Sequence, residues 1–139
     1  MTHFLLPAAA LVLWTFVLWF VLYARRLPAM AKVHEDAQEF IRQPDLMNTL
    51  PDRARWAADN YNHLHEQPTL FYAVMLLLFV TEQTGSLNLG LGWAYFGLRV
   101  VHSLVQVSSN VVLVRFSLFA TSSMLLLALA VRAFLGLLG

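Results

Sequence analysis

The longest uncharged segment of the chain sets the first limit on its fold. Phe4–Tyr23 contains no charged side chain, and its length allows a helix to cross the roughly 30 Å hydrocarbon core of a bilayer. A signal peptide has a shorter apolar region, a basic leader and a cleavage site at its end. This segment lacks those features, so we expect a membrane anchor.

The composition of the whole chain agrees with a membrane protein. Hydrophobic residues make up 59% of its 139 residues and charged residues only 12%, whereas about a quarter of the residues in a soluble domain are charged. A net charge of +1 without a dense basic block gives no signal for a nucleic-acid partner. The chain has no cysteine, which excludes disulfides, thiolate metal sites and a sulfur nucleophile of its own. Any thiol chemistry therefore needs a thiol that arrives with a substrate.

Three more apolar segments follow the first. We expect spans at about 4–23, 60–82, 87–108 and 113–138, a cytoplasmic loop at about 24–59, and a single domain over 1–139. The second span is unusual because its apolar part, Pro68–Thr81, gives only about 21 Å of helix. Its helix is expected to extend back through Glu66, with a kink near Pro68. The predicted fold class is an all-α integral membrane four-helix bundle.

The distribution of positive charge predicts the orientation of these spans. The loop after the first span holds six basic residues, and the loop near Glu82–Asn88 holds none. The positive-inside rule then places the first loop in the cytoplasm and both termini outside.

The third apolar segment carries a polar stripe. Its polar residues recur at helical spacings and fall on one face roughly 80° wide; they are Tyr95, Arg99, His102, Ser103, Gln106 and Asn110. A charged residue at bilayer depth costs at least about 2.5 kcal/mol, so such residues face a bundle interior or a wet cavity. The stripe therefore predicts a binding site for a soluble anion that enters from the cytoplasm.

The other spans bring polar groups to the same leaflet, and each group also has a structural interpretation. Arg25 and Arg26 end the first span and are also placed as interfacial anchors. Arg115 begins the fourth span, and its position fits an interfacial anchor equally well. Asn62 and Glu66 are spaced to line one helix face or to cap it, and an Arg99–Glu66 ion pair would brace two helices. No two histidines stand at i, i+4, so we expect no metal site.

Two elements of the sequence resemble a known family. Asn60-Tyr-Asn-His-Leu-His-Glu66-Gln-Pro68-Thr-Leu-Phe71-Tyr72 is similar to the second-helix signature of the MAPEG family, the membrane-associated proteins in eicosanoid and glutathione metabolism. Arg99-Val-Val-His102-Ser103, followed by Asn110 and Arg115, resembles its third and fourth helices. The version here is closest to bacterial members, which implies a bacterial inner membrane.

The resemblance implies a homotrimer of four-helix bundles that binds glutathione between subunits, open to the cytoplasm. It assigns Arg115 to stabilising the glutathione thiolate, since a nearby cation lowers the pKa of a thiol. Glu66 is suited to the ammonium group of glutathione. The remaining glutathione-binding residues implied are Arg25, Arg26, Asn62, Arg99, His102 and Gln106.

The chain departs from the eukaryotic enzymes at several positions. Asn62 and Glu66 are four residues apart where those enzymes use three, and Gln106 and Phe119 stand where better-known members place tyrosines. The leading hypothesis is a glutathione transferase or peroxidase acting on hydrophobic electrophiles from the bilayer. The alternative is a non-catalytic, lipid-binding scaffold or accessory subunit of the same fold. Transport is less favoured, because paired Gly or Pro breaks are missing.

Overall fold

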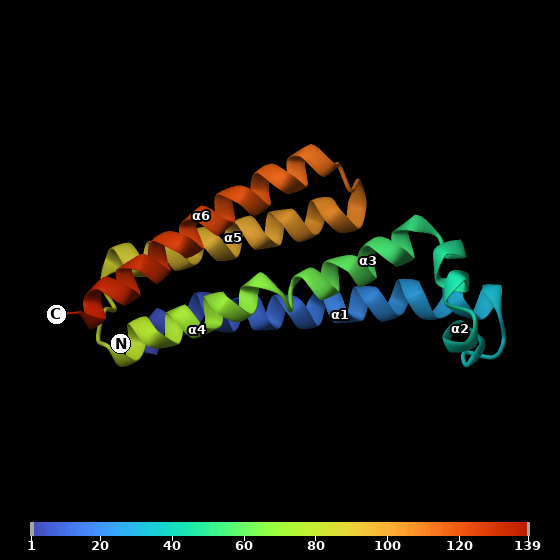
Figure 1. The fold of residues 1–139 in the computed structure, drawn as a ribbon, viewed down its shortest axis with the longest axis horizontal. Helices are drawn as coiled ribbons and strands as arrows, with labels where there is room; N and C mark the ends of the chain where they lie inside the picture. Colours follow the sequence, from blue (N-terminus) through green and yellow to red (C-terminus); the bar gives the residue numbers. More distant parts are fainter. Residues whose placement is uncertain (1, 139) are drawn as a thin grey trace.

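The computed structural model describes residues 2–138, and every regular element in that part of the chain is helical (Figure 1). Two of the elements, η1 and η2, are short 3-10 helices. In chain order the elements are η1 (Thr2–Leu5), α1 (Leu6–Val33), α2 (Glu39–Arg42), η2 (Pro44–Thr49), α3 (Asp52–His63), α4 (Gln67–Val80), α5 (Ser86–Ser108) and α6 (Val112–Leu137). The all-α prediction is confirmed.

The long helices pack side by side. Helices α3 and α4 follow one another along α1, and α5 and α6 form an antiparallel pair (Figure 1). Contacts between α3 and α5 and between α4 and α6 join the two layers. Both termini lie at one end of the molecule, and α2 with η2 lies at the other. This arrangement places the end of α3, the polar half of α5 and the start of α6 near one another.

The second apolar segment is two helices rather than one continuous helix over 60–82. Helix α3 ends at His63 and α4 begins at Gln67. The physical cause is Pro68, which has no N–H to donate to the Leu64 carbonyl and whose ring would clash with that carbonyl in a continuous helix. The turn is closed by backbone bonds from His65 to Asn62 (2.9 Å) and from Glu66 to His63 (3.4 Å). The kink expected near Pro68 is thus a full break just before it.

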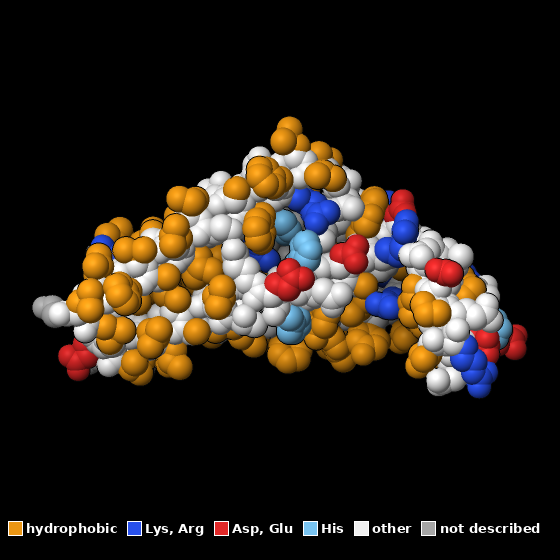
Figure 2. Space-filling view, viewed as in Figure 1, with side chains coloured by type: hydrophobic (Ala, Val, Ile, Leu, Met, Phe, Trp, Pro, Cys, Tyr) orange, Lys and Arg blue, Asp and Glu red, His pale blue; other side chains and the backbone are white. Residues whose placement is uncertain are grey.

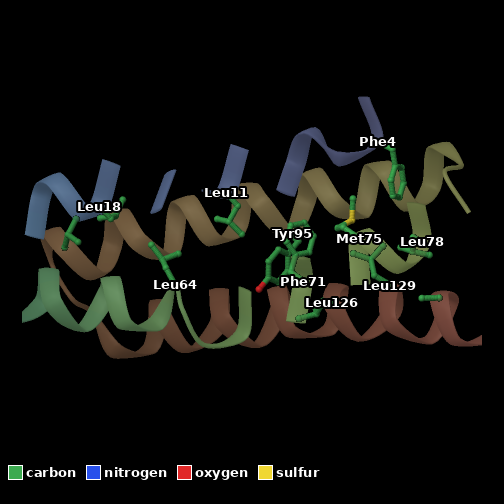
Figure 3. Packing of buried hydrophobic residues seen from close by; sticks show 12 residues of the cluster. Phe4, Leu11, Leu18, Leu64, Phe71, Met75, Leu78, Tyr95, Leu126 and Leu129 are labelled. Carbon is green, nitrogen blue, oxygen red and sulfur yellow. The ribbon is translucent and has the colours of Figure 1, made fainter. Parts of the chain in front are cut away.

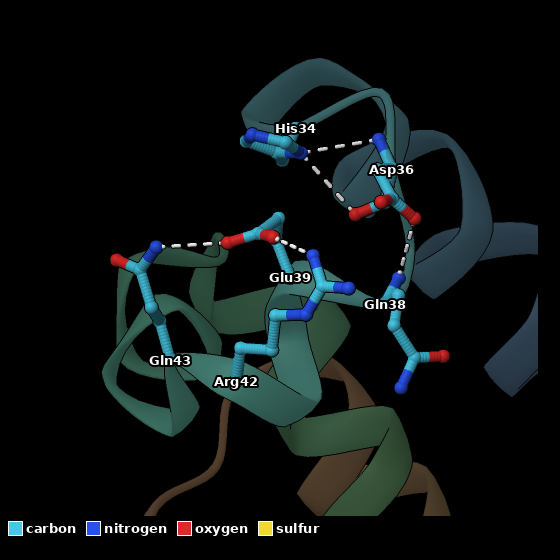
Figure 4. Close-up of polar contacts among 6 residues, drawn as sticks. All are labelled: His34, Asp36, Gln38, Glu39, Arg42 and Gln43. Atoms are coloured by element: carbon cyan, nitrogen blue, oxygen red, sulfur yellow. Dashed lines mark hydrogen bonds and ion pairs between the residues drawn. The ribbon is translucent and has the colours of Figure 1, made fainter.

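Helix also replaces part of the loop expected at 24–59. Helix α1 continues ten residues past Tyr23 to Val33, and α3 starts at Asp52. The connection after α1 is a polar surface turn in which Glu39 pairs with Arg42 at 2.5 Å and the Asp36 carboxylate accepts from the Gln38 backbone N–H at 2.9 Å (Figure 4). These residues are solvated and far from the polar stripe of α5.

Two of the described helices have both the length and the hydropathy of a membrane span. They are the helical segment His3–Val33 and α6. Helix α4 is apolar but has only 14 residues, and α5 is long but carries the polar stripe. In a bilayer, α4 is too short to cross on its own, and the polar stripe of α5 cannot face lipid. Both helices therefore need neighbouring helices beside them.

The apolar core fixes α4 against α5. The rings of Phe71 and Tyr95 stack with centroids 4.3 Å apart, and both residues are buried (Figure 3). A Cβ on Gly92 would lie 3.2 Å from the end of the Met75 side chain, so this glycine leaves room for that side chain against α5. The resulting contact sets the depth at which the polar stripe of α5 faces the end of α3.

Candidate functional site

The polar stripe predicted on the third span lies on α5 and faces the protein interior. Arg99, His102, Ser103 and Gln106 are all buried, and the Arg99 side chain is 1% exposed. The 3.6-residue period of the helix places them on the side that contacts α3 and α6.

A neutral hydrogen-bond network joins this face of α5 to α3. The Asn60 amide nitrogen donates to Gln106 Oε1 at 3.0 Å and to Ser103 Oγ at 3.2 Å. His102 Nε2 donates to the same Gln106 oxygen at 3.2 Å. We call Asn60, His102, Ser103 and Gln106 the inner network. It holds the end of α3 against α5.

Arg99 braces the break between α3 and α4. Its Nη2 donates at 3.2 Å to the His63 carbonyl, which also accepts from the Glu66 backbone N–H in the turn after α3. A cation at a helix C-terminus also interacts favourably with the helix dipole. Its guanidinium carbon lies 5.7 Å from the Phe119 ring centre, within cation–π range. The Arg99–Glu66 ion pair is not formed; the two ion pairs among the described residues lie elsewhere.

Arg115 is held at the start of α6 by the turn that precedes it. Asn110 has a positive φ of 51°, and its backbone N–H closes the end of α5 by donating to the Val105 carbonyl at 2.8 Å. Its side-chain Oδ1 accepts from Arg115 Nη1 at 2.5 Å. The turn thereby directs a half-buried guanidinium toward α3.

Arg115 lines two adjoining cavities of different character. One, of about 310 Å³, has mainly apolar walls formed by Val112, Phe116 and Phe119, with His63, Glu66 and His102. The other, of about 240 Å³, is polar and is lined by Asp59, Asn62, His63, Glu66 and Arg115. We call the two together the cleft. Figure 2 shows acidic, basic and histidine side chains gathered in the middle of this face, beside apolar surface.

A third cavity continues the cleft toward the α2 end of the molecule. It measures about 480 Å³ and shares Asp59 and Asn62 with the polar cavity. Arg26 lies on its wall, where its Nη2 contacts the Met47 sulfur at 3.2 Å.

Comparison with protein families decides the class of protein. The model of the MAPEG family matches residues 4–135, which is nearly the whole chain. The chain belongs to the MAPEG family. Comparisons with curated proteins and with solved structures gave no match.

Membership of MAPEG places the protein in a known functional setting. The family comprises membrane proteins of glutathione-related or eicosanoid metabolism. Together with the two long apolar helices, it indicates an integral membrane protein in a lipid bilayer.

The MAPEG site residues predicted from the sequence separate into four groups. Asn62, Glu66, His102 and Arg115 line the cleft. Arg99 and Gln106 lie behind its wall and brace it, and Arg26 lies at its α2 end. Arg25 is turned away, because its Nη1 donates to the Val107 carbonyl at 2.6 Å and so caps the end of α5.

The predicted set of site residues omits three residues of this MAPEG site: Asp59 and His63 on the cleft wall and Asn60 in the inner network. Asn110 was predicted as part of the polar stripe, but its pairing with Arg115 was not. Asn60 continues the buried stripe of α3 that includes Ala54 and Ala57, so the spacing of those alanines was a usable signal.

Several buried nitrogen atoms in the MAPEG cleft and behind its wall have no partner within the described protein. They are Nε and Nη1 of Arg99 and Nε of Arg115. Nδ1 of His63 and of His102 is also unpartnered. An unmade hydrogen bond from a buried charged group is costly. Of the two arginines, only Arg115 lines the cleft, so the arrangement favours binding of an anion beside Arg115. No group of three or more potential metal ligands occurs among the described residues.

Proposed function

We propose that this MAPEG protein is a glutathione-dependent transferase or peroxidase that acts on hydrophobic electrophiles. The observation that carries the proposal is the position of Arg115, which lines both the polar and the apolar cavity. With the glutathione thiol at that junction, the peptide part of glutathione would occupy the polar cavity and the acceptor substrate the apolar cavity.

The polar cavity matches the chemistry of glutathione, which carries two carboxylates and one ammonium group. Glu66 offers a carboxylate to the ammonium, and Asn62 offers an amide to the peptide. Arg26, at the α2 end, is placed to pair with a carboxylate. Arg99 and Gln106 support the cleft from behind its wall, Arg99 through its hydrogen bond to the His63 carbonyl at the break between α3 and α4.

The proposed chemistry depends on the cation at Arg115. Its guanidinium favours the thiolate over the thiol, which raises the concentration of the nucleophile at neutral pH. In the transferase reaction the thiol loses its proton to water, and the thiolate forms a bond to an electrophilic carbon of the acceptor. The bond from that carbon to its leaving group breaks, and the leaving group departs as an anion, chloride in the case of 1-chloro-2,4-dinitrobenzene. Val112, Phe116 and Phe119 form an apolar wall against which a hydrophobic acceptor would lie near the sulfur.

The proposed assembly is a homotrimer of four-helix bundles with clefts between subunits. Large apolar side chains at the start of α6 are strongly exposed, among them Val112 and Leu113 at 74%. Such a surface fits contact with a second copy or with lipid. The basic first loop supports a cytoplasmic opening with both termini outside.

The test is replacement of Arg115 by Leu, with turnover of glutathione and 1-chloro-2,4-dinitrobenzene measured in detergent. Loss of one preorganised cation at the reacting sulfur is expected to lower turnover about 100-fold. Arg132→Leu is the matched control, because Arg132 is on the same helix but donates to Asn88 away from the cleft. Unchanged turnover in Arg115→Leu would remove the assigned role.

The second candidate is a non-catalytic scaffold that keeps the cleft for a lipid. The apolar walls at Phe116 and Phe119 favour it, since an acyl chain would fit there. Calorimetry that detects no glutathione binding, together with a lipid that co-purifies, would establish this function instead.

A further inference from the structure

We propose that Asn110 is the residue that positions Arg115 for the reaction without adding a negative charge to it. Asp59 and Glu66 line the same polar cavity but form no ion pair with Arg115, and His63 and His102 line the cleft beside it. The inference rests on the proposed function and adds a residue to it. Asn110 lines the third cavity but touches neither reacting atom, so its effect on the reaction passes through Arg115.

The backbone at Asn110 restricts the residue types that fit. Its φ of 51° is left-handed, a conformation that glycine, asparagine and aspartate adopt most readily. A glycine would close α5 equally well but has no side-chain acceptor. An aspartate would accept the same hydrogen bond but would place a negative charge on Arg115. Asparagine alone of the three combines the backbone conformation with a neutral acceptor.

Arg115 needs such a partner because its place in α6 is electrostatically unfavourable. It lies four residues after the N-cap Val111, and a helix N-terminus carries partial positive charge that disfavours a cation. An unrestrained guanidinium would turn toward water. The 2.5 Å bond from Nη1 to Asn110 Oδ1 keeps it on the cleft wall, with its Nε buried and unpartnered.

Two variants separate the position of Arg115 from its charge. Asn110→Gly keeps the turn and removes the acceptor, so turnover with glutathione is expected to fall about tenfold at every pH. Asn110→Asp keeps the bond and neutralises the cation. The rise of turnover with pH, which follows ionisation of the bound thiol, is then expected to move about one unit upward.

The control is Ser109→Gly, which loosens the same turn without touching Arg115; Ser109 is exposed. Wild-type turnover is expected for it. In an Arg115→Leu background, Asn110→Gly is expected to add no further loss, because a residue that acts through Arg115 has nothing left to position.

The outcomes distinguish this inference from the proposed function. If Asn110→Asp shows the same turnover and the same pH profile as the wild type, the role of Asn110 is overturned and the proposed function stands. An equal loss in Ser109→Gly and Asn110→Gly would also overturn it, in favour of turn flexibility. A wild type without glutathione-dependent turnover at any pH would overturn the proposed function, and this role with it.

Discussion

The inner network and the cleft meet at His102 on α5, yet they use their polar groups in different ways. The inner network contains no carboxylate, lysine or arginine, and its side chains bond to one another, with Asn60 Oδ1 and His102 Nδ1 left without a partner. The cleft contains Arg115, backed by Arg99, and the unpartnered atoms of these arginines are cationic donors. The first arrangement stabilises the fold, and the second leaves binding energy for a ligand.

The difference has a physical basis in the cost of buried charge. A buried neutral pair repays its desolvation with one or two hydrogen bonds, whereas a buried cation needs an anion as well. His102 of α5 belongs to both the inner network and the cleft, and both regions also include residues of α3. The two regions should therefore respond differently to mutation, one in stability and the other in ligand binding.

The largest expected effect separates Asn60 from Asn62 on the same helix. Asn60→Leu should lower the free energy of unfolding by about 2 kcal/mol, since it removes two bonds of the inner network. Asn62 is exposed on the cleft wall, so Asn62→Leu should weaken glutathione binding and leave stability unchanged. Thermal unfolding in detergent and calorimetry measure the two quantities. The reverse result would mean that the regions are assigned the wrong way round.

A smaller effect is expected at Glu66. Glu66→Gln removes the carboxylate proposed for the ammonium of glutathione and should weaken binding about tenfold. A glutathione analogue without the amino group should bind the two proteins equally, which is the internal control. An equal loss for both ligands would show that Glu66 shapes the cleft rather than recognising the ammonium.

The smallest effects separate the two arginines at the end of the first span. Arg25→Ala should cost about 1 kcal/mol of stability, because its side chain caps α5. Arg26→Ala should instead raise the KM for glutathione several-fold, since Arg26 lines the continuation of the cleft. Identical behaviour of the two variants would argue for interfacial anchoring of both.

The sequence was sufficient for the features that follow from periodicity. The stripe on α5 was predictable, since every third or fourth residue from Tyr95 to Gln106 shares a helix face. The all-helical class followed from the apolar segments, and the MAPEG family from the motifs around Glu66 and Arg99.

Features that depend on local backbone geometry were not predictable in the same way. The proline signalled a kink, but the separate end of α3 at His63, and the carbonyl it offers to Arg99, required the three-dimensional turn. Asn110 gave a weak signal, because asparagine is only the second choice after glycine at a left-handed helix end. Arg25 and Arg26 point in different directions because they are consecutive residues of one helix. Which of them faces the cleft depends on the rotation of α1 about its axis, which no pattern in the sequence specified.

The central claim is that the cleft binds glutathione and that Arg115 keeps its sulfur ionised. The most direct test is the ultraviolet difference spectrum of glutathione added to the purified protein at neutral pH, for the wild type and for Arg115→Leu. We predict a thiolate absorption band with the wild type and its loss in the variant, while calorimetry still detects binding to both. Bound glutathione that remains a thiol in the wild type, or a band of equal size in the variant, would contradict the account.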